Sequence, residues 1–296
     1  MELIRRGDFK TISRSISLIE NESPGYAAIL SGLQQLNSSL VIGVTGPPGS
    51  GKSTLVDGLI GQWISLGKKI AVLCVDPSSP FHYGALLGDR IRMSEWYNHP
   101  KVFIRSLATR GSLGGLHPKI IEITDLLRSA SFDYIIIETV GVGQSEIEIA
   151  GLADTTVVVM VPEAGDEIQT MKAGIMEIAD IFVVNKADHS EADKFVRHIE
   201  SVFEFNSGEN SREPIVIKTI ATEKKGLPEL TEAISAKAPG KNTPHKIVLL
   251  AEKAYQLIVQ KRMRDIEKQL LEKQLKLQLE NPGFNLYKFI EENYKD

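Results

Sequence analysis

Residues 41–54 read VIGVTGPPGSGKST, in which an apolar segment runs into a glycine-rich turn and then into a predicted helix. Gly46, Gly51, Lys52 and Ser53 fit the phosphate-loop pattern G-x-x-x-x-G-K-[ST]. The strand–turn–helix context favours this interpretation over a glycine-rich turn without a ligand. Backbone N–H groups of such a loop and the positive end of its helix attract phosphate oxygens. Lys52 would reach the β- and γ-phosphates, and Ser53 would ligate Mg²⁺. We expect the whole nucleotide-phosphate cradle to comprise Gly49, Ser50, Gly51, Lys52, Ser53 and Thr54.

The chain of 296 residues has the composition of an ordinary globular protein, with 42% hydrophobic and 24% charged residues. Its formal net charge of -4 provides no basic field, so we expect no nucleic-acid partner. No apolar run approaches the ~20 residues of a membrane span, and the start MELIRRGDFK lacks the apolar core of a signal peptide. The single cysteine, Cys74, lies in an apolar segment and is expected in the core. Together these features predict a cytoplasmic protein without a membrane partner.

Short apolar segments alternate with helical stretches along the chain. Most of the segments are continuously apolar, as in parallel strands covered on both faces. They span residues 40–44, 70–75, 102–104, 134–137, 155–161, 181–184 and 214–218. Helices are predicted between them at 52–66, 119–129, 166–178 and 192–203. This order predicts a doubly wound, mostly parallel α/β sheet of the P-loop type, with ligands bound at the carboxyl ends of the strands.

Three parts are expected: a helical N-terminal extension (1–38), a P-loop domain (39–238) and a helical C-terminal segment (239–296). In the last part Met263, Ile266, Leu270 and Leu277 recur at helical spacing, which indicates an amphipathic helix. From the residues alone, that helix either lies on its own domain or forms a subunit interface.

Asn185-Lys186-Ala187-Asp188 follows the apolar segment 181–184 and has the form of a guanine-reading motif, N-K-x-D. The Asp188 carboxylate would accept hydrogen bonds from guanine N1–H and its amino group, a pattern that adenine does not offer. Asn185 would brace the base and the loop, and the stem of Lys186 would lie over the purine. Ala221, after the last apolar segment, is placed to offer its backbone N–H to guanine O6. The alternative is a polar turn at a strand end.

Acidic residues follow three apolar segments and are candidate ligands of Mg²⁺ or of its waters. Asp76, Asp89 and Glu138 would join Ser53 around the ion, and the backbone N–H of Gly141 would sense the γ-phosphate. The alternatives are a solvated acid at Glu138 and a helix-start ion pair at Asp89. Lys172, in the helical stretch after residue 161, would on its own be a surface lysine.

Seven segments in this order resemble one family, the MeaB-type G-protein chaperones, also called ArgK, which include the human methylmalonic aciduria type A protein. The segments are GPPGSGKST, DPSSP, GALLGDRIRM, RSLATRGSLGGL, ETVGVGQSE, AGDEIQTMKAGI and NKAD, and RRGDFKTISRSISLIEN resembles the helical lead-in of the family. The resemblance covers residues 4–235, with weaker likeness in the C-terminal helices. His82-Tyr83-Gly84 departs from the Thr-Gly-Gly of the family, which puts the mobility of that loop in question.

The resemblance implies a SIMIBI-class GTPase that acts as a homodimer on an adenosylcobalamin-dependent acyl-CoA mutase, usually methylmalonyl-CoA mutase. It would gate cofactor loading and protect or reactivate the mutase. Asp76 and Asp89 would lie in a first switch region, Glu138 in a second, and Lys172 in a third that couples to the mutase. The resemblance also favours a dimer role for the C-terminal helix. Relatives serve other cobalamin mutases, so the client stays open.

The expected reaction is Mg²⁺-dependent hydrolysis of GTP to GDP and phosphate, slow without a partner because no arginine finger is evident. The candidate catalytic residues are Lys52, Asp76, Glu138, Gly141 and Lys172, with Asp76 orienting the attacking water. A metallocentre-assembly GTPase is a weaker alternative, since six scattered histidines and one cysteine form no cluster. A scaffold that binds GTP without hydrolysing it is the other alternative.

Overall fold

The computed structural model describes most of the chain, and every statement below concerns the described residues. These are residues 1–34, 39–76, 93–109, 116–139, 145–162, 178–206, 215–237, 244–263, 266, 268–281 and 283–294. They form two compact units, Met1–Ile247 and Val248–Asp296. Among them, no helix is both long and apolar enough to cross a membrane.

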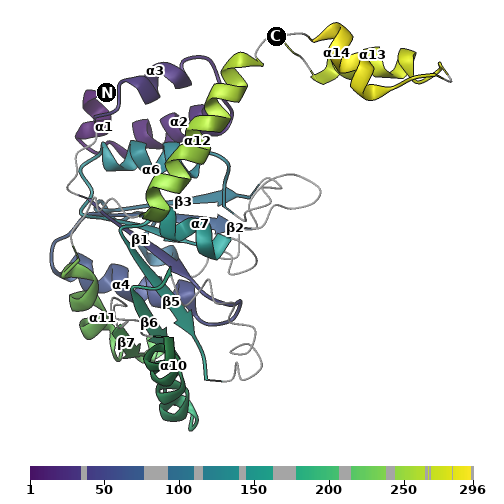
Figure 1. Ribbon diagram of the computed structural model, residues 1–296. Helices are drawn as coiled ribbons and strands as arrows, with labels where there is room; N and C mark the ends of the chain where they lie inside the picture. The colour runs from purple at the N-terminus through teal and green to yellow at the C-terminus, as the bar shows by residue number, and fades with distance from the viewer. Residues whose placement is uncertain are drawn as a thin grey trace. The chain divides into compact units, whose positions relative to one another are not determined.

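The first unit is built on a seven-stranded, all-parallel sheet with the order β3-β2-β4-β1-β5-β6-β7 (Figure 1). Its strands are β1 Leu40–Thr45, β2 Ile70–Asp76, β3 Val102–Ala108, β4 Tyr134–Glu138, β5 Thr155–Met160, β6 Ile181–Val184 and β7 Ile215–Lys218. The predicted doubly wound parallel fold is therefore confirmed. β1 lies between β4 and β5, where the order of strands along the sheet reverses, and open α/β sheets bind ligands at such a point.

Helices cover both faces of this sheet. α4 (Lys52–Ser65) and α11 (Leu227–Ser235) pack on one face, over alternate residues of the strands such as Val157 and Val159. α10 (Ala192–Asn206) covers the opposite face, where it packs on Val158 and Phe182. α7 (Ser145–Leu152) lies over β1, where a Cβ on Gly43 would come within 2.5 Å of Ile149 Cγ1. The third predicted helix, 166–178, falls almost wholly outside the described residues.

Short helices α1 (Glu2–Arg5), α2 (Phe9–Glu20) and α3 (Tyr26–Ser31) form the N-terminal layer, and α2 packs against α6 (Ile120–Arg128). Asp8 caps α2 by accepting a hydrogen bond from Thr11 N at 2.7 Å. The ring of Phe9 stacks on Phe132 at a centroid distance of 6.1 Å. The guanidinium of Arg105 on β3 hydrogen-bonds the Glu20 carboxylate. These contacts attach the N-terminal helices to the sheet as part of the same unit.

One of the two tryptophans belongs to α4, and the other is hydrogen-bonded to it. Trp63 is fully buried and stacks on Tyr134 of β4 at 4.2 Å between ring centroids. Trp96, in the 3-10 turn η1 (Ser94–Trp96), is half-buried and donates its Nε1–H to Asp57 of α4 at 2.8 Å. The turn that follows residues 77–92 is therefore bonded to the helix that follows the phosphate loop.

The second unit consists of most of α12 (Pro244–Arg262), together with α13 (Lys268–Gln278) and α14 (Leu286–Asn293). Asn285 caps α14 by accepting from the N–H groups of Tyr287 and Lys288. Tyr294 Oη donates to Gln274 Oε1 of α13 at 2.7 Å, which joins the two short helices. The remaining 3-10 turn, η2 (Ala221–Glu223), belongs to the first unit and to the site described next.

Candidate nucleotide-binding site

The turn between β1 and α4 follows a path that only glycine accepts at two points. Gly46 has φ +136°, and a Cβ there would lie 2.1 Å from the carbonyl oxygen of Val159 on β5. Gly51 caps α4 with φ +89°, and a Cβ there would meet Asn185 Nδ2 at 2.3 Å. The loop is therefore held close to both β5 and the residue that follows β6. This is the glycine requirement that the phosphate-loop pattern predicts.

Lys52 folds back over this loop. Its Nζ donates to the carbonyl oxygens of Gly46 at 2.8 Å and Pro47 at 3.0 Å, and the residue is buried. The ammonium group therefore lies above the concave side of the loop, beside the N-terminal end of α4. A phosphate bound there would meet a full positive charge and a helix N-terminus together.

The acidic end of the site comes from neighbouring strands. In the β1–β4 register Val44 lies opposite Glu138, so the end of β4 meets the root of the phosphate loop. Glu138 Oε1 accepts a hydrogen bond from Ser53 Oγ at 2.6 Å, with both side chains buried. Asp76, also buried, ends the adjacent strand β2, two residues beyond the Cys74–Glu138 pair. The structure thus brings together three of the four predicted metal-ligating residues.

These oxygens fit Mg²⁺, which prefers hard oxygen ligands and retains several waters. Ser53 would supply a hydroxyl and Glu138 a carboxylate, directly or through water, because the two already lie within one hydrogen bond of each other. Asp76 adds a second carboxylate in the same cavity. Across the described part of the chain, no group of three His, Cys, Asp or Glu residues is placed to hold a metal ion. Any cation here would therefore depend on the Ser53 hydroxyl and on further oxygen ligands such as waters.

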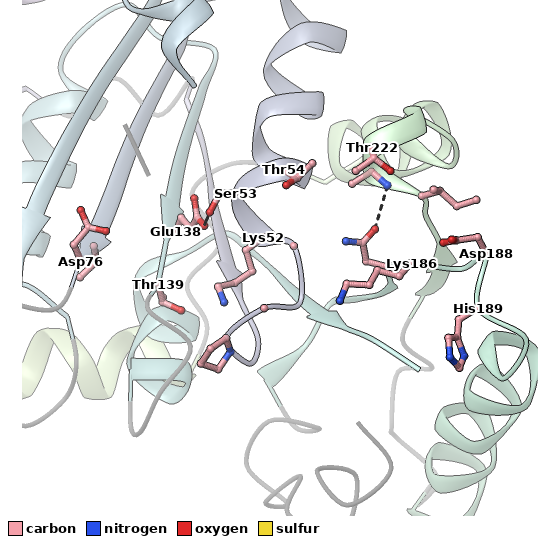
Figure 2. Close-up of a pocket in the computed structure, with 17 residues that line it drawn as sticks. Lys52, Ser53, Thr54, Asp76, Glu138, Thr139, Lys186, Asp188, His189 and Thr222 are labelled. Atoms are coloured by element: carbon pink, nitrogen blue, oxygen red, sulfur yellow. Dashed lines mark hydrogen bonds between the residues drawn. The ribbon is translucent and has the colours of Figure 1, made fainter. Parts of the chain in front are cut away.

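Asn185 connects the guanine-reading motif to the phosphate loop. Its Nδ2 donates to Ser50 O at 2.9 Å, and its Oδ1 accepts from Thr219 Oγ1 and Ala221 N, each at 3.1 Å. Figure 2 shows the last of these bonds as a dashed line. One buried side chain thus joins three segments: the phosphate loop, the end of β6 and the turn after β7. Ala221 N–H, predicted to face guanine O6, is bonded to Asn185 in this structure.

Asp188 and Lys186 lie on an exposed turn that tertiary hydrogen bonds hold in place. Lys186 adopts the left-handed conformation with φ +55°, uncommon for a residue with a side chain. The N–H of Ala187 donates to Thr219 O at 3.0 Å. The Glu223 carboxylate, paired with Lys225 at 2.6 Å, raises the pKa of Lys225, and the negative charge of Asp188 adds to that shift. Asp188 therefore lies within electrostatic range of the 221–225 turn.

One cavity of about 630 Å³ contains both ends of the site. In Figure 2 Ser53, Glu138 and Lys52 lie toward one end and Lys186, Asp188 and His189 toward the other. The lining residues come from the phosphate loop, the ends of β2, β4 and β6, and the turn after β7: Pro48, Gly49, Gly51, Lys52, Ser53, Thr54, Val75, Asp76, Glu138, Thr139, Asn185, Lys186, Asp188, His189, Ile220, Ala221 and Thr222. The volume lies within the range of small-molecule sites.

Most of the predicted binding residues line this cavity, with four exceptions. Ser50 is a fully buried residue of the loop, and its carbonyl oxygen accepts from Asn185. Asp89, Gly141 and Lys172 lie outside the described residues, as does Tyr83. Sequence reasoning missed six lining residues: Pro48, Val75, Thr139, His189, Ile220 and Thr222. Each stands next to a predicted residue in the chain, and that adjacency was the available signal.

Comparison with known proteins identifies the family. Residues 12–275 match the family model described as "Methylmalonyl Co-A mutase-associated GTPase MeaB". The chain belongs to this family. It is therefore a P-loop GTPase of the MeaB family, whose members bind GTP and GDP, as the sequence motifs predicted.

Individual relatives agree with this placement. A Pyrococcus abyssi protein provisionally named a GTPase is 45% identical over 79% of this chain and 74% of its own length. GTPase ArgK of Escherichia coli is 36% identical over 78% of this chain and 72% of its own. A methylmalonic aciduria type A homolog of Caenorhabditis elegans, described as mitochondrial, is 45% identical over 50% of this chain and 37% of its own.

Solved structures support the fold of this MeaB-family chain. A crystal structure described as a LAO/AO transport system kinase superposes with a TM-score of 0.61 at 28% identity, covering 95% of this chain and 85% of its own. HypB from Helicobacter pylori, solved in complex with nickel, gives a TM-score of 0.53 at 16% identity. The match covers 79% of this chain and 99% of HypB. The second likeness concerns the fold alone. The all-parallel sheet and the P-loop GTPase neighbours are consistent with the SIMIBI class that was predicted.

Proposed function

We propose that this MeaB-family GTPase hydrolyses GTP in the cavity between the phosphate loop and the Asn185–Asp188 motif, and that it serves an adenosylcobalamin-dependent acyl-CoA mutase. The observation that carries the first half is that one cavity joins Lys52, Ser53 and Glu138 at one end to Asp188 at the other. The family match over residues 12–275 supports the second half, because the family is described by its association with methylmalonyl-CoA mutase.

The phosphate end supplies charge and position for in-line attack of water on the γ-phosphate. Lys52, which lies over the loop, would neutralise charge that develops on the phosphate oxygens. Ser53, Glu138 and Asp76 would hold Mg²⁺, which contributes positive charge beside the β- and γ-phosphates when bound. Asp76 is the candidate to orient the attacking water. Gly141 as γ-phosphate sensor, Asp89 as a further ligand and Lys172 as a coupling residue remain predictions.

The base end supplies the preference for guanine. Asp188 would accept two hydrogen bonds from guanine, and Asn185 holds the turn that carries Asp188 against the phosphate loop. A change at the base end is thereby transmitted to the loop through one side chain. We expect slow hydrolysis by the isolated protein and faster hydrolysis when a partner orders the residues around the γ-phosphate.

Guanine reading is tested by Asp188→Asn. Loss of the carboxylate removes two charge-assisted hydrogen bonds, so GTP affinity should fall about 10- to 100-fold. Affinity for xanthosine triphosphate should rise, because the Asn amide donates to the carbonyl that replaces the guanine amino group. Fluorescent-nucleotide titration measures both values. Asp193→Asn is the matched control, since Asp193 pairs with Lys218 on the surface and does not line the cavity. Unchanged guanine preference in Asp188→Asn would overturn the assignment.

Hydrolysis and the client are tested together with purified components. Phosphate release under single-turnover conditions separates a hydrolysing GTPase from a scaffold that only binds GTP. The same assay is repeated with methylmalonyl-CoA mutase and with the mutases of isobutyryl-CoA and hydroxyisobutyryl-CoA. One of them should accelerate release and co-elute in the presence of a GTP analogue. If no mutase accelerates phosphate release and none co-elutes, the client proposal is wrong, although the GTPase assignment stands.

We further propose a homodimer formed through residues 239–296, with 39–238 as the GTPase domain and 1–38 as its helical extension. α12 supports this, because it exposes apolar side chains along most of its length: Ile247, Val248, Leu250, Tyr255, Leu257, Ile258 and Val259. A single helix with so much exposed apolar surface gains stability from a partner. We also propose a cytoplasmic location, because a single, buried, free Cys74 is typical of proteins in a reducing compartment.

A further inference from the structure

Two threonine hydroxyls join the root of the phosphate loop to the end of β4. Thr45 is the last residue of β1 and Thr139 is the first residue after β4. Thr139 Oγ1 donates to Thr45 Oγ1 at 2.8 Å, and both side chains are buried, with 2% and 0% of their surface exposed. Thr139 N also donates to Val44 O at 3.0 Å. The two strand ends are thus joined by a backbone bond and by a side-chain bond.

This pair lies between the two groups that the reaction would use. Thr45 immediately precedes Gly46, whose carbonyl oxygen accepts from Lys52 Nζ at 2.8 Å. Thr139 immediately follows Glu138, whose carboxylate accepts from Ser53 Oγ at 2.6 Å. Thr139 also lines the cavity, and Figure 2 shows it near Lys52 and Glu138. A rotation at either strand end would therefore change the separation between the acid and the loop.

Packing alone does not call for two hydroxyls at these positions. Valine has the same branched shape as threonine and suits a buried strand end equally well, whereas a buried hydroxyl needs a hydrogen-bond partner. The other flank of the loop root is fixed by close approach, since Gly46 leaves no room for a Cβ beside Val159 O on β5. The hydroxyl pair provides the corresponding attachment on the β4 side.

We propose that Thr139 is a positioning residue for GTP hydrolysis, which it serves through its hydrogen bond to Thr45. By fixing the end of β4 against the loop root, the pair would keep Glu138 and the phosphate loop in the relative position that the transition state requires. The inference rests on the proposed hydrolysis at this site. It assigns Thr139 no contact with the nucleotide, so both hydroxyls should be needed equally.

The test is a double-mutant cycle in the full-length protein, with Thr139→Val, Thr45→Val and the double variant. Each single variant should lower the single-turnover rate of phosphate release about three- to tenfold, while the Kd for GDP stays within about twofold of wild type. The double variant should be no slower than the single variants, because both remove the same bond. Thr139→Ser keeps a hydroxyl and should retain a rate close to wild type.

Three results would overturn the inference. If Thr139→Val is slow and Thr45→Val is normal, the Thr139 hydroxyl acts on the nucleotide directly. If rates stay at the wild-type value while the melting temperature falls, the pair has a packing role only. If the losses in the two single variants add in the double variant, the hydroxyls act independently. A wild-type protein that releases no phosphate would instead refute the proposed hydrolysis, so the two failures are distinguishable.

Discussion

Asn185 connects the two ends of the site. Its amide makes three hydrogen bonds, to Ser50, Thr219 and Ala221, and all three distances are 3.1 Å or less. The donor end of the amide thus bonds to the phosphate loop and the acceptor end to the turn after β7, two segments outside its own. The same residue also limits position 51 to glycine, because its Nδ2 occupies the space of a Cβ. The phosphate and base ends of the cavity are therefore connected through one amide.

Asn185→Ala should destabilise the protein and weaken nucleotide binding together. Three buried hydrogen bonds at ~1 kcal/mol each predict a loss of about 2–4 kcal/mol in the free energy of unfolding. GTP affinity should fall by more than tenfold, since the loop and the turn after β7 lose their common attachment. Urea unfolding and nucleotide titration measure the two effects. Asn21→Ala, at the exposed end of α2, is the control and should change neither appreciably. A normal unfolding curve for Asn185→Ala would contradict the bridging role.

At this scale the sequence was informative wherever a motif is local. The positions of Lys52, Ser53 and Asp188 follow from short patterns whose chemistry depends on neighbouring residues in the chain. Thr139 and His189 belong to no such pattern, and adjacency to Glu138 and Asp188 in the chain was the local signal for them. Their place in the cavity depends on which strand ends meet, and that depends on the order of strands in the sheet.

Strands were predicted well because parallel strands are continuously apolar. β3 is the instructive difference: residues 102–104 were expected, but the strand extends to Ala108. Arg105 and Ser106 interrupt the apolar run, and Arg105 is accommodated by Glu20, which is 85 residues away in the chain. A partner so distant in sequence leaves no local signal. The end of β3 and its contact with the N-terminal helices could therefore be located only in the structure.

The contact between β1 and α7 predicts a paired result for two glycines. At Gly43 a Cβ would lie 2.5 Å from Ile149 Cγ1 and 3.2 Å from Ala153 Cβ, so Gly43→Ala should displace α7 and destabilise the protein by about 1–3 kcal/mol. Gly61 lies inside α4 with only ordinary contacts at 3.7 Å to Trp96. Gly61→Ala should stabilise the protein by about 0.5–1 kcal/mol through helix propensity. Thermal unfolding should therefore rank Gly61→Ala above wild type and Gly43→Ala below it. The reverse order would contradict the packing described for β1.

At the scale of the whole molecule, the site and the proposed dimer surface belong to different stretches of chain. Every residue that lines the cavity lies between Pro48 and Thr222, within the first compact unit. The exposed apolar residues of α12 come later in the chain, mostly in the second unit. We therefore expect that substitutions on α12 can alter the proposed dimer without changing any residue that lines the cavity.

The variant Leu250→Asp/Leu257→Asp should separate these properties. Both leucines are exposed on α12, and charges there would make burial against a second copy unfavourable. Light scattering coupled to size exclusion should show a dimer for wild type and a monomer for the variant, with unchanged affinity for GDP. Glu252→Gln, on the same helix, should remain dimeric. A wild-type protein that is monomeric at micromolar concentration would refute the dimer proposal.

The hydrogen bond between Trp96 and Asp57 has a spectroscopic consequence. The chain has two tryptophans, and Trp63 is sealed in the core against Tyr134. Trp96 is half-exposed, directly follows the stretch that contains the predicted first switch, and is bonded to the helix whose first turn would face the phosphates. Its indole emission is sensitive to solvent and to the nearby carboxylate. The fluorescence of Trp96 in the unmodified protein should therefore report structural changes between the predicted first switch and α4 when the nucleotide changes.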